Sequence, residues 1–227
     1  MQTLDRTTQG PIGPCVVRWL ISTIIMKHSL PEVTPEVLKE SKIEVAEVND
    51  IPRIQQIAEM VKLDPKNPDR EKLNKGFLIY TLSDKQYSIR LNDYFTIARK
   101  ENGDTVGFLM CYDTAFLRRL IASGEIAHED GIMNFLQTTE PNSNYIFGDQ
   151  IGIDYSQSNK GIGRKLLKDL FAKMKANGIE KMYVAVLSKP VENLVSKNFC
   201  KNLGAKKVSE VENSDGLGWS IYKFEVE

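Results

Sequence analysis

The residues with the clearest chemical potential lie between Ile151 and Leu170, in the stretch IGIDYSQSNKGIGRKLLKDL. An apolar run leads into a polar turn that contains Gly161 and Gly163, and a basic amphipathic run follows. A strand-to-helix turn of this kind leaves backbone amides free at the helix N-terminus, where they can surround an anion such as a phosphate. The residues that we expect to form this cradle are Ser158, Asn159, Lys160, Gly161, Ile162, Gly163 and Arg164.

Two well-known phosphate motifs are excluded at this turn. A P-loop has Gly-Lys-Ser/Thr, but Gly163 is followed by Arg164, Lys165 and Leu166. A dinucleotide fingerprint has a third glycine three residues after the second, and Leu166 stands there. Two interpretations remain, namely an amide cradle for an anion and a plain strand-to-helix turn. The basic residues near the turn favour the anion, since the chain as a whole is neutral.

Composition limits the class of protein. The 227 residues contain 30 basic and 30 acidic side chains, with 41% hydrophobic and 26% charged residues. A chain of this size can bury a sizeable core, and its balanced charge argues against nucleic acid and membrane as partners. Cys15, Cys111 and Cys200 are scattered and only two histidines are present, so we expect no metal site and no disulfide framework. A reducing, cytoplasmic environment is the corresponding prediction.

The chain divides into an N-terminal extension and one domain. The run CVVRWLISTIIM, from Cys15 to Met26, is interrupted by Arg18 and is shorter than the about 20 residues that cross a bilayer. We expect residues 1–40 to be partly disordered or an appended element, and residues 41–227 to form the domain. Within the domain the hydrophobic pattern predicts a strand, helices, three strands, a helix, a strand, a helix and two strands. Residues 114–143 read as irregular and polar, with one helix near Phe116 to Ala122.

Two blocks of the domain resemble a known family. SNKGIGRKLL resembles the acyl-coenzyme A pyrophosphate motif of the GNAT superfamily of N-acetyltransferases, Gln/Arg-x-x-Gly-x-Gly/Ala, with Ser158 at its first position. ENLVSKNFCKNLGAKKV is similar to a later helix of the family, in which the matching residues here are Asn193, Ser196, Phe199, Leu203 and Gly204. The resemblance covers roughly Ile43 to the C-terminus.

The resemblance implies a fold and an activity. The expected fold class is α/β, a mixed and mostly antiparallel sheet of about seven strands flanked by helices, with splayed central strands. The expected activity moves an acetyl group from acetyl-coenzyme A to a primary amine by direct attack in a ternary complex. The acceptor is a small-molecule amine or a protein amine, and the resemblance is compatible with a homodimer. The further residues that it assigns to coenzyme binding are Ile151, Gly152, Ile153, Asn193 and Phe199.

Catalytic groups are less defined by the resemblance. Asp149 is the preferred base for the ammonium group, Asp154 is the alternative, and Tyr112 and Asp113 are candidates for the amine pocket. The family often has a tyrosine as the acid for the leaving thiolate, and Cys200 occupies its place here. A protonated thiol can donate a proton, but Cys200 can equally be a small buried hydrophobe. A non-catalytic acyl-coenzyme A-binding or protein-interaction module is therefore the alternative function.

Acidic residues in the segment before the central strand are candidates for attracting a cationic amine. They are Glu125, Glu129, Asp130 and Glu140.

Overall fold

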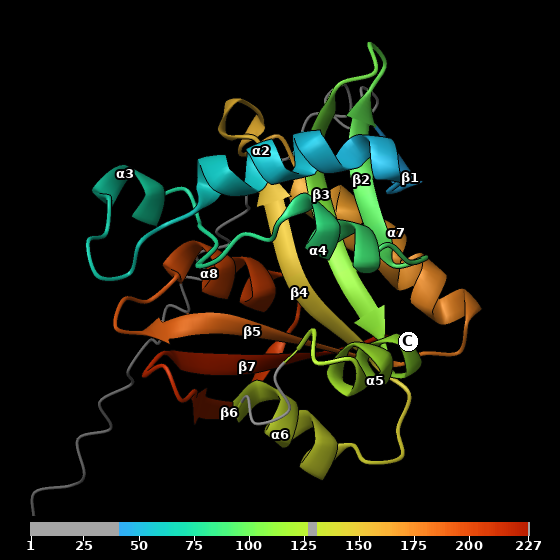
Figure 1. The fold of residues 1–227 in the computed structure, drawn as a ribbon, viewed down its shortest axis with the longest axis vertical. Helices are drawn as coiled ribbons and strands as arrows, with labels where there is room; N and C mark the ends of the chain where they lie inside the picture. The colour runs from blue at the N-terminus through green and yellow to red at the C-terminus, as the bar shows by residue number, and fades with distance from the viewer. Residues whose placement is uncertain (1–40, 127–130, 227) are drawn as a thin grey trace, which may run out of the picture. The chain divides into compact units, whose positions relative to one another are not determined.

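The computed structural model describes residues 41–126 and 131–226, which all belong to the unit Val33–Glu227. Their seven strands form one sheet in the order β1-β2-β3-β4-β5-β7-β6 (Figure 1). Neighbouring strands are antiparallel except for β4 and β5, which are parallel. The predicted mixed, mostly antiparallel sheet is therefore confirmed. The strands are β1 Ser41–Val45, β2 Phe95–Lys100, β3 Thr105–Asp113, β4 Ile146–Ile153, β5 Lys181–Lys189, β6 Lys206–Glu212 and β7 Gly218–Glu225.

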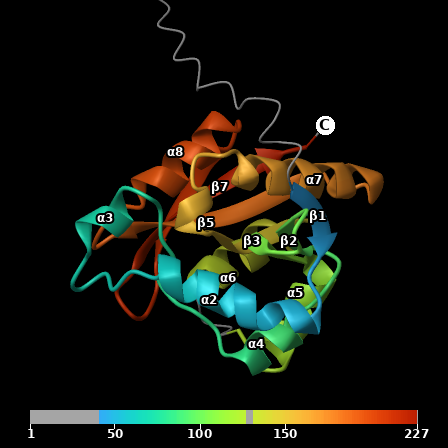
Figure 2. The same cartoon turned by 90° about the horizontal axis from the view of Figure 1, so that it is seen from above.

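Helices cover both faces of the sheet. Helices α2, α4, α5 and α6 lie on one face, and α7 and α8 lie on the other (Figure 2). The helices are η1 Val48–Asp50, α2 Ile51–Val61, α3 Arg70–Leu73, α4 Asp84–Ile89, α5 Thr114–Ala122, α6 Gly131–Thr139, η2 Tyr155–Gln157, α7 Ile162–Ala176 and α8 Leu194–Asn202. We call the first face the α2 face and the second the α7 face.

Local sequence patterns account for the elements that position the site. Helix α7 buries Ile162, Leu166, Leu170 and Met174, which recur at the helical period and face the sheet. Helix α4 begins with a capping box in which Ser83 and Gln86 satisfy each other's backbone amides. The two largest apolar clusters of the described residues lie on opposite sides of the sheet because side chains alternate along each strand.

The segment 114–143 differs from the prediction. The sequence pattern predicts one helix in an otherwise irregular segment, whereas the structure has two helices there, α5 and α6. In α6, Ile132, Met133 and Leu136 are buried on the α2 face. Their apolar pattern spans only two turns between polar residues, so periodicity over a longer window did not indicate a helix. The prediction for residues 1–40 falls outside the described residues.

The central strands β4 and β5 pair along only part of their length. Strand β4 pairs with β5 only from Ile146 to Gly148, opposite Met182 to Val184. Beyond Gly148 the two strands diverge, as Figure 1 shows, while β4 continues to pair with β3. The pairing of β4 with β3 also shifts between Gly148 and Gln150, which makes Asp149 the extra residue of a β-bulge. The splayed strands match what the resemblance implied.

Within the residues described, no helix has the length and apolarity needed to cross a bilayer.

Candidate functional site

A cavity of about 150 Å³ opens where β4 and β5 diverge. Its walls include β4 around Asp149, β5 from Val184 to Leu187, the segment Phe77–Tyr80, helix α8 and Trp219 of β7. The segment Phe77–Tyr80 is tied to β4 because the Gln150 amide donates to the Tyr80 carbonyl at 3.2 Å. The cavity thus lies where β4 and β5 lack a backbone ladder.

The turn before α7 presents a row of backbone amides. Among the described residues, the amides of 159–164 donate to no protein acceptor, and the first bond of the helix runs from Lys165 N to Gly161 O at 3.0 Å. The Ser158 amide donates to Tyr155 O at 3.2 Å, so the row begins one residue later than expected. Six consecutive amides without a protein acceptor at a helix N-terminus supply the kind of donors that an anion binds.

Two residues with left-handed backbone shape this turn. Gly161 has φ +78° and Asn159 has φ +62°. Glycine adopts this conformation without steric cost, and asparagine tolerates it better than most residues. The turn therefore folds back sharply enough to collect successive amides on one side, which explains the glycine at position 161.

Contacts around Gly163 join the turn to the cavity. A Cβ atom at this position would lie 3.3 Å from Phe199 Cζ and 3.5 Å from Ile151 Cδ1. Both of these residues line the cavity. Three predicted coenzyme-binding residues from separate elements are thus brought together. Ile153 lies farther along β4 and packs into the core of the α7 face.

The basic residues near the turn have different surroundings. Lys160 Nζ donates to Gln157 Oε1 at 3.1 Å and stays beside the turn. Lys165 Nζ donates to the carbonyl of Ser41, at the start of β1. The ammonium group of Lys160 therefore contacts a residue next to the amide row, whereas that of Lys165 contacts the start of β1.

Asp149 accepts hydrogen bonds from two tyrosines. Tyr80 Oη donates to Oδ1 and Tyr112 Oη donates to Oδ2, each at 2.7 Å. Donors on both oxygens stabilise the ionised carboxylate and hold it in one orientation. Asp149 and Tyr80 line the cavity, so a fixed negative charge lies in its wall. Tyr80 was not predicted, and no sequence pattern marked it.

Tyr112 is a donor to this carboxylate throughout the physiological range. Burial raises the pKa of Tyr112 well above its usual value, and the neighbouring Asp149 carboxylate raises it further. The phenol therefore stays protonated, because ionising it would place two negative charges side by side in a buried setting.

The two other acidic candidates have structural partners instead. Asp154 caps η2 through Ser156 and pairs with Arg53 at 2.5 Å. Burial opposes the charge of Asp154, but hydrogen bonds from Ser156 and Arg53 outweigh it and lower the pKa. Asp113 caps α5 by accepting from Phe116 N at 2.7 Å. Neither carboxylate lines the cavity, whereas Asp149 does.

Cys200 lies in the cavity wall on helix α8. The side chain is buried, and burial raises the pKa of the thiol to about 12. The thiol therefore remains protonated at neutral pH and is a weak acid. Both sequence-based interpretations of Cys200, as a weak acid and as a small hydrophobe, remain compatible with this setting.

Two further predicted coenzyme residues have clear packing roles. Asn193 Oδ1 accepts from Ser196 N at 3.1 Å and Nδ2 donates to Phe77 O at 2.9 Å, so this side chain starts α8 and holds a cavity wall. A Cβ atom at Gly152 would lie 2.4 Å from Phe108 Cε1 on the α2 face. Gly152 is thus required by close packing within the sheet.

The acidic residues before the central strand do not form an open cluster in the described part of the segment. Glu125 pairs with Arg90 at 3.5 Å, and Glu140 accepts from Lys181 at 3.0 Å and from Tyr183 at 2.5 Å. Glu129 and Asp130 lie outside the described residues. Glu125 and Glu140 thus hold the segment to the rest of the domain.

The chain belongs to the acetyltransferase (GNAT) family, whose sequence model matches residues 56–205. This family uses acetyl-coenzyme A and acetylates amine acceptors. No protein in a search of curated sequences matches the chain.

Solved structures share the fold at low sequence identity. Ard1 from Thermoplasma volcanium is 12% identical with a TM-score of 0.57, covering 83% of this chain and 99% of its own. The ribosomal-protein-S18-alanine N-acetyltransferase from Escherichia coli is 13% identical with a TM-score of 0.52, covering 82% and 94%. The putative acetyltransferase yncA from Salmonella typhimurium, solved with acetyl-CoA, is 15% identical with a TM-score of 0.50, covering 83% and 95%.

Proposed function

We propose that this protein is an N-acetyltransferase that moves an acetyl group from acetyl-coenzyme A to a primary amine by direct attack in a ternary complex. The observation that carries the proposal is the row of six amides at the N-terminus of α7, next to the gap between β4 and β5. Membership of the GNAT family supports the same coenzyme.

The residues present fit the coenzyme. The amides of 159–164 suit a diphosphate, and the absence of a side chain at Gly163 lets Phe199 and Ile151 pack against the turn. The edge of β4 beyond Gly148 has no partner strand among the described residues, so its backbone groups can bind the pantetheine arm. When bound, acetyl-coenzyme A supplies an acetyl group activated as a thioester.

Asp149 is the proposed base. Its carboxylate can bind the ammonium form of the acceptor and accept a proton, directly or through one water molecule. Tyr80 and Tyr112 hold the carboxylate in place through their two hydrogen bonds. The mainly apolar wall of the cavity limits the access of water, which strengthens these electrostatic interactions.

The setting of Cys200 supports a second candidate function, the binding of acyl-coenzyme A without turnover. Cys200 is buried, and a thiol with a pKa of about 12 is a poor proton donor to a leaving thiolate. If the leaving group requires a protein acid, the chain would bind acyl-coenzyme A without turning it over. Thiol release from acetyl-coenzyme A with a broad panel of amines separates the two functions, because a binding module would release none.

Replacing Gly161 with aspartate tests the amide row directly. We expect Gly161→Asp to abolish acetyl-coenzyme A binding, measured by calorimetry, because a carboxylate would enter the anion site and repel the phosphates. The matched control is Gly178→Asp at the other end of α7, where glycine also has a positive φ of +64°. The control carries the same backbone strain without the charge at the turn, so it should bind normally. Unchanged affinity in Gly161→Asp would remove the diphosphate assignment.

A further inference from the structure

We propose that Gln150 is a positioning residue for the base, and that it acts through Tyr80 on the carboxylate of Asp149. This inference rests on the proposed function and adds a residue to its machinery. Gln150 follows Asp149 in strand β4, and its side chain is buried in the wall of the cavity.

Two consecutive residues of β4 hold the same tyrosine. Tyr80 Oη donates to Asp149 Oδ1 at 2.7 Å, and Gln150 Nε2 donates to the Tyr80 carbonyl at 3.2 Å. Consecutive residues of a regular strand point to opposite faces, but the β-bulge at Asp149 lets both side chains reach the α2 face. We call these two bonds the Tyr80 clamp. The bond to the carbonyl fixes the backbone of Tyr80 and so places its hydroxyl at the carboxylate.

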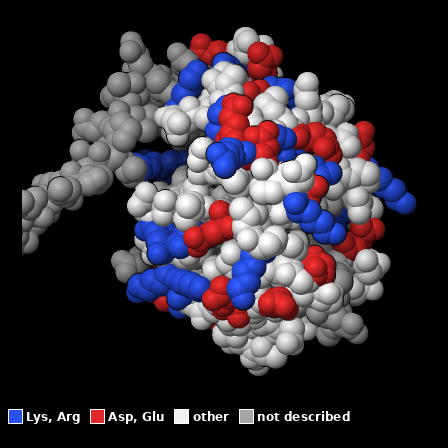
Figure 3. All heavy atoms as spheres, turned by 90° about the vertical axis from the view of Figure 1, so that its left-hand side faces the viewer, with Lys and Arg blue, Asp and Glu red and all other residues white. Residues whose placement is uncertain are grey.

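Donors close to Asp149 favour its ionised form. Tyr80 and Tyr112 each donate to one oxygen of the carboxylate, and each such bond stabilises the negative charge. On the face that Figure 3 shows, acidic and basic side chains are interspersed, so that face has no single-sign field. Loss of one local donor should therefore raise the pH at which the base becomes protonated.

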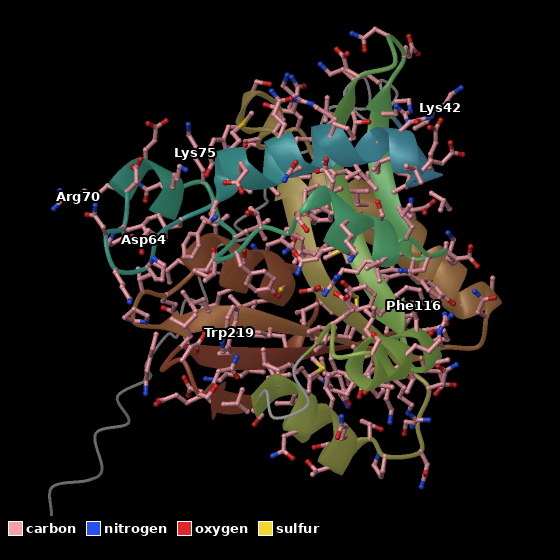
Figure 4. All side chains as sticks on the ribbon, in the orientation of Figure 1. Lys42, Asp64, Arg70, Lys75, Phe116 and Trp219 are labelled. Atoms are coloured by element: carbon pink, nitrogen blue, oxygen red, sulfur yellow. The ribbon has the colours of Figure 1, made fainter. Side chains whose placement is uncertain are left out.

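Tyr80 lies on backbone that has no regular structure to hold it. It belongs to the irregular chain between α3 and α4, and 45% of its surface is exposed. The first part of this chain is held at η2, because Tyr155 Oη donates to the Gly76 carbonyl at 3.3 Å and Lys75, labelled beside α3 in Figure 4, lies over the Tyr155 ring. An exposed side chain on irregular backbone samples several conformations unless a bond fixes it, and Gln150 supplies such a bond.

The orientation of the Gln150 amide follows from its neighbours. A backbone carbonyl can only accept, so the amide nitrogen faces Tyr80 and the amide oxygen faces Tyr87, whose hydroxyl donates to it at 3.0 Å. Burial raises the pKa of Tyr87, so this hydroxyl stays protonated and remains a donor. Tyr87 therefore fixes Gln150, and Gln150 fixes Tyr80.

A double-mutant cycle isolates the clamp from the further interactions that Asp149 and Tyr80 make. Gln150→Leu removes the donor to the carbonyl, and Tyr80→Phe removes the hydroxyl. We expect each variant to lower kcat/KM by about tenfold and the double variant also by about tenfold, because both changes remove the same bond to Asp149. Independent effects, about a hundredfold in the double variant, would overturn the inference, as would wild-type activity in Gln150→Leu.

The measurement is thiol release at saturating acetyl-coenzyme A. The probe is the amine that wild type acetylates fastest among hexylamine, phenethylamine, spermidine and an alanyl peptide.

The pH profile is a second readout, which a purely structural role would not move. We expect the acid limb of kcat/KM to move to higher pH by about one unit in Gln150→Leu and in Tyr80→Phe, since the ionised base has lost a donor. The matched control is Gln55→Leu on α2, whose side chain donates to the Leu82 carbonyl at 3.5 Å and does not line the cavity. The control should keep the wild-type profile. An acid limb that stays in place in Gln150→Leu would contradict the positioning role.

A second variant guards against misfolding. Gln150→Leu leaves the Tyr87 hydroxyl without its acceptor, which lowers stability, whereas combining it with Tyr87→Phe removes both partners at a smaller cost. We expect the combined variant to show the same loss of activity and the same moved acid limb as Gln150→Leu. Denaturant unfolding checks that each variant is folded under the assay conditions. A combined variant that is folded and has the wild-type acid limb would contradict the inference.

Failure of this inference is distinguishable from failure of the proposed function. Absence of thiol release by wild type with every amine overturns both. Equal activity of wild type and Asp149→Asn overturns the assignment of the base, and the inference with it. Activity that depends on Asp149, with independent effects of Tyr80→Phe and Gln150→Leu, overturns only the inference.

Discussion

Asp149 combines a negative charge, a fixed orientation and a place in the cavity wall. The charge comes from the sequence, but the orientation depends on Tyr80 and Tyr112, which lie 69 and 37 positions away along the chain. Asp154, five positions later, has the same side chain and a different role because it caps η2 and pairs with Arg53. The same residue type therefore acquires its function from the donors around it.

Replacing Asp149 with asparagine tests its role as the base. Asp149→Asn keeps the size of the side chain but removes the charge and the ability to accept a proton. We expect kcat/KM for the best acceptor amine to fall by about 10²–10⁴, the usual contribution of general base catalysis. The measurement is thiol release at saturating acetyl-coenzyme A.

Asp154→Asn is the matched control. It makes the same chemical change at the alternative candidate, which does not line the cavity. We expect kcat/KM to stay within about tenfold of the wild type, while the capped turn loses stability. The reverse pattern, with activity lost only in Asp154→Asn, would assign the base to Asp154.

At the scale of elements, β4 does the most to create the site. Its bulge at Asp149 places consecutive residues Asp149 and Gln150 toward the α2 face, as their bonds to Tyr112 and Tyr87 show. The strand also leaves β5 after Gly148, which opens the gap. A regular strand would keep its ladder to β5 and would leave no cavity there.

The absence of a side chain at Gly152 leaves room for the Phe108 ring to pack against strand β4. We expect Gly152→Ala to lower the free energy of unfolding by about 1–3 kcal/mol, because the new methyl group would lie 2.4 Å from the Phe108 ring and the packing must shift. Denaturant unfolding at neutral pH measures the change. In a double-mutant cycle, Phe108→Leu should relieve part of the loss. Strict additivity of the two substitutions would contradict this packing explanation.

At the scale of the domain, the segment with α5 and α6 is held to the sheet by polar bonds as well as by its apolar residues. Glu140, directly after α6, accepts from Lys181 and from the buried Tyr183, both on β5. Burial by itself would raise the pKa of Glu140, but hydrogen bonds from Ser143, Tyr183 and Lys181 outweigh it and lower the pKa to about 2. This carboxylate is therefore more stable ionised in the folded protein than in the unfolded chain.

The lowered pKa predicts how stability depends on pH. The folded state binds the proton of Glu140 less tightly than the unfolded state, whose value is about 4.3. Its contribution is therefore present above that value and is lost as the pH falls toward about 2. At neutral pH we expect Glu140→Gln to reduce the free energy of unfolding by about 1–3 kcal/mol, with the difference from wild type shrinking in acid.

Denaturant unfolding at a series of pH values measures this difference. The control is Glu210→Gln, which removes an exposed carboxylate that pairs with Lys207, and it should change stability little. A difference between wild type and Glu140→Gln that stays constant from neutral pH to acid would contradict the proposed ion pair.

The sequence by itself determined the parts of the fold and site that depend on neighbouring residues. The stripe of α7 is a helical period, and the β2–β3 hairpin is a local alternation around a polar turn. The amide row could be located in advance because backbone amides of adjacent residues and two glycines suffice to form it. The same locality explains why the family could be recognised from short blocks.

Only the tertiary structure decided which side chains surround the cavity. Strand parity cannot tell which face Asp149 lies on, because a bulge resets the alternation and no local signal marks it. Tyr80 and Trp219 reach the site from distant elements, so their roles arise from packing between segments. Backbone amides carry their chemistry wherever a turn forms, whereas a side chain acquires its chemistry from the partners that folding brings to it.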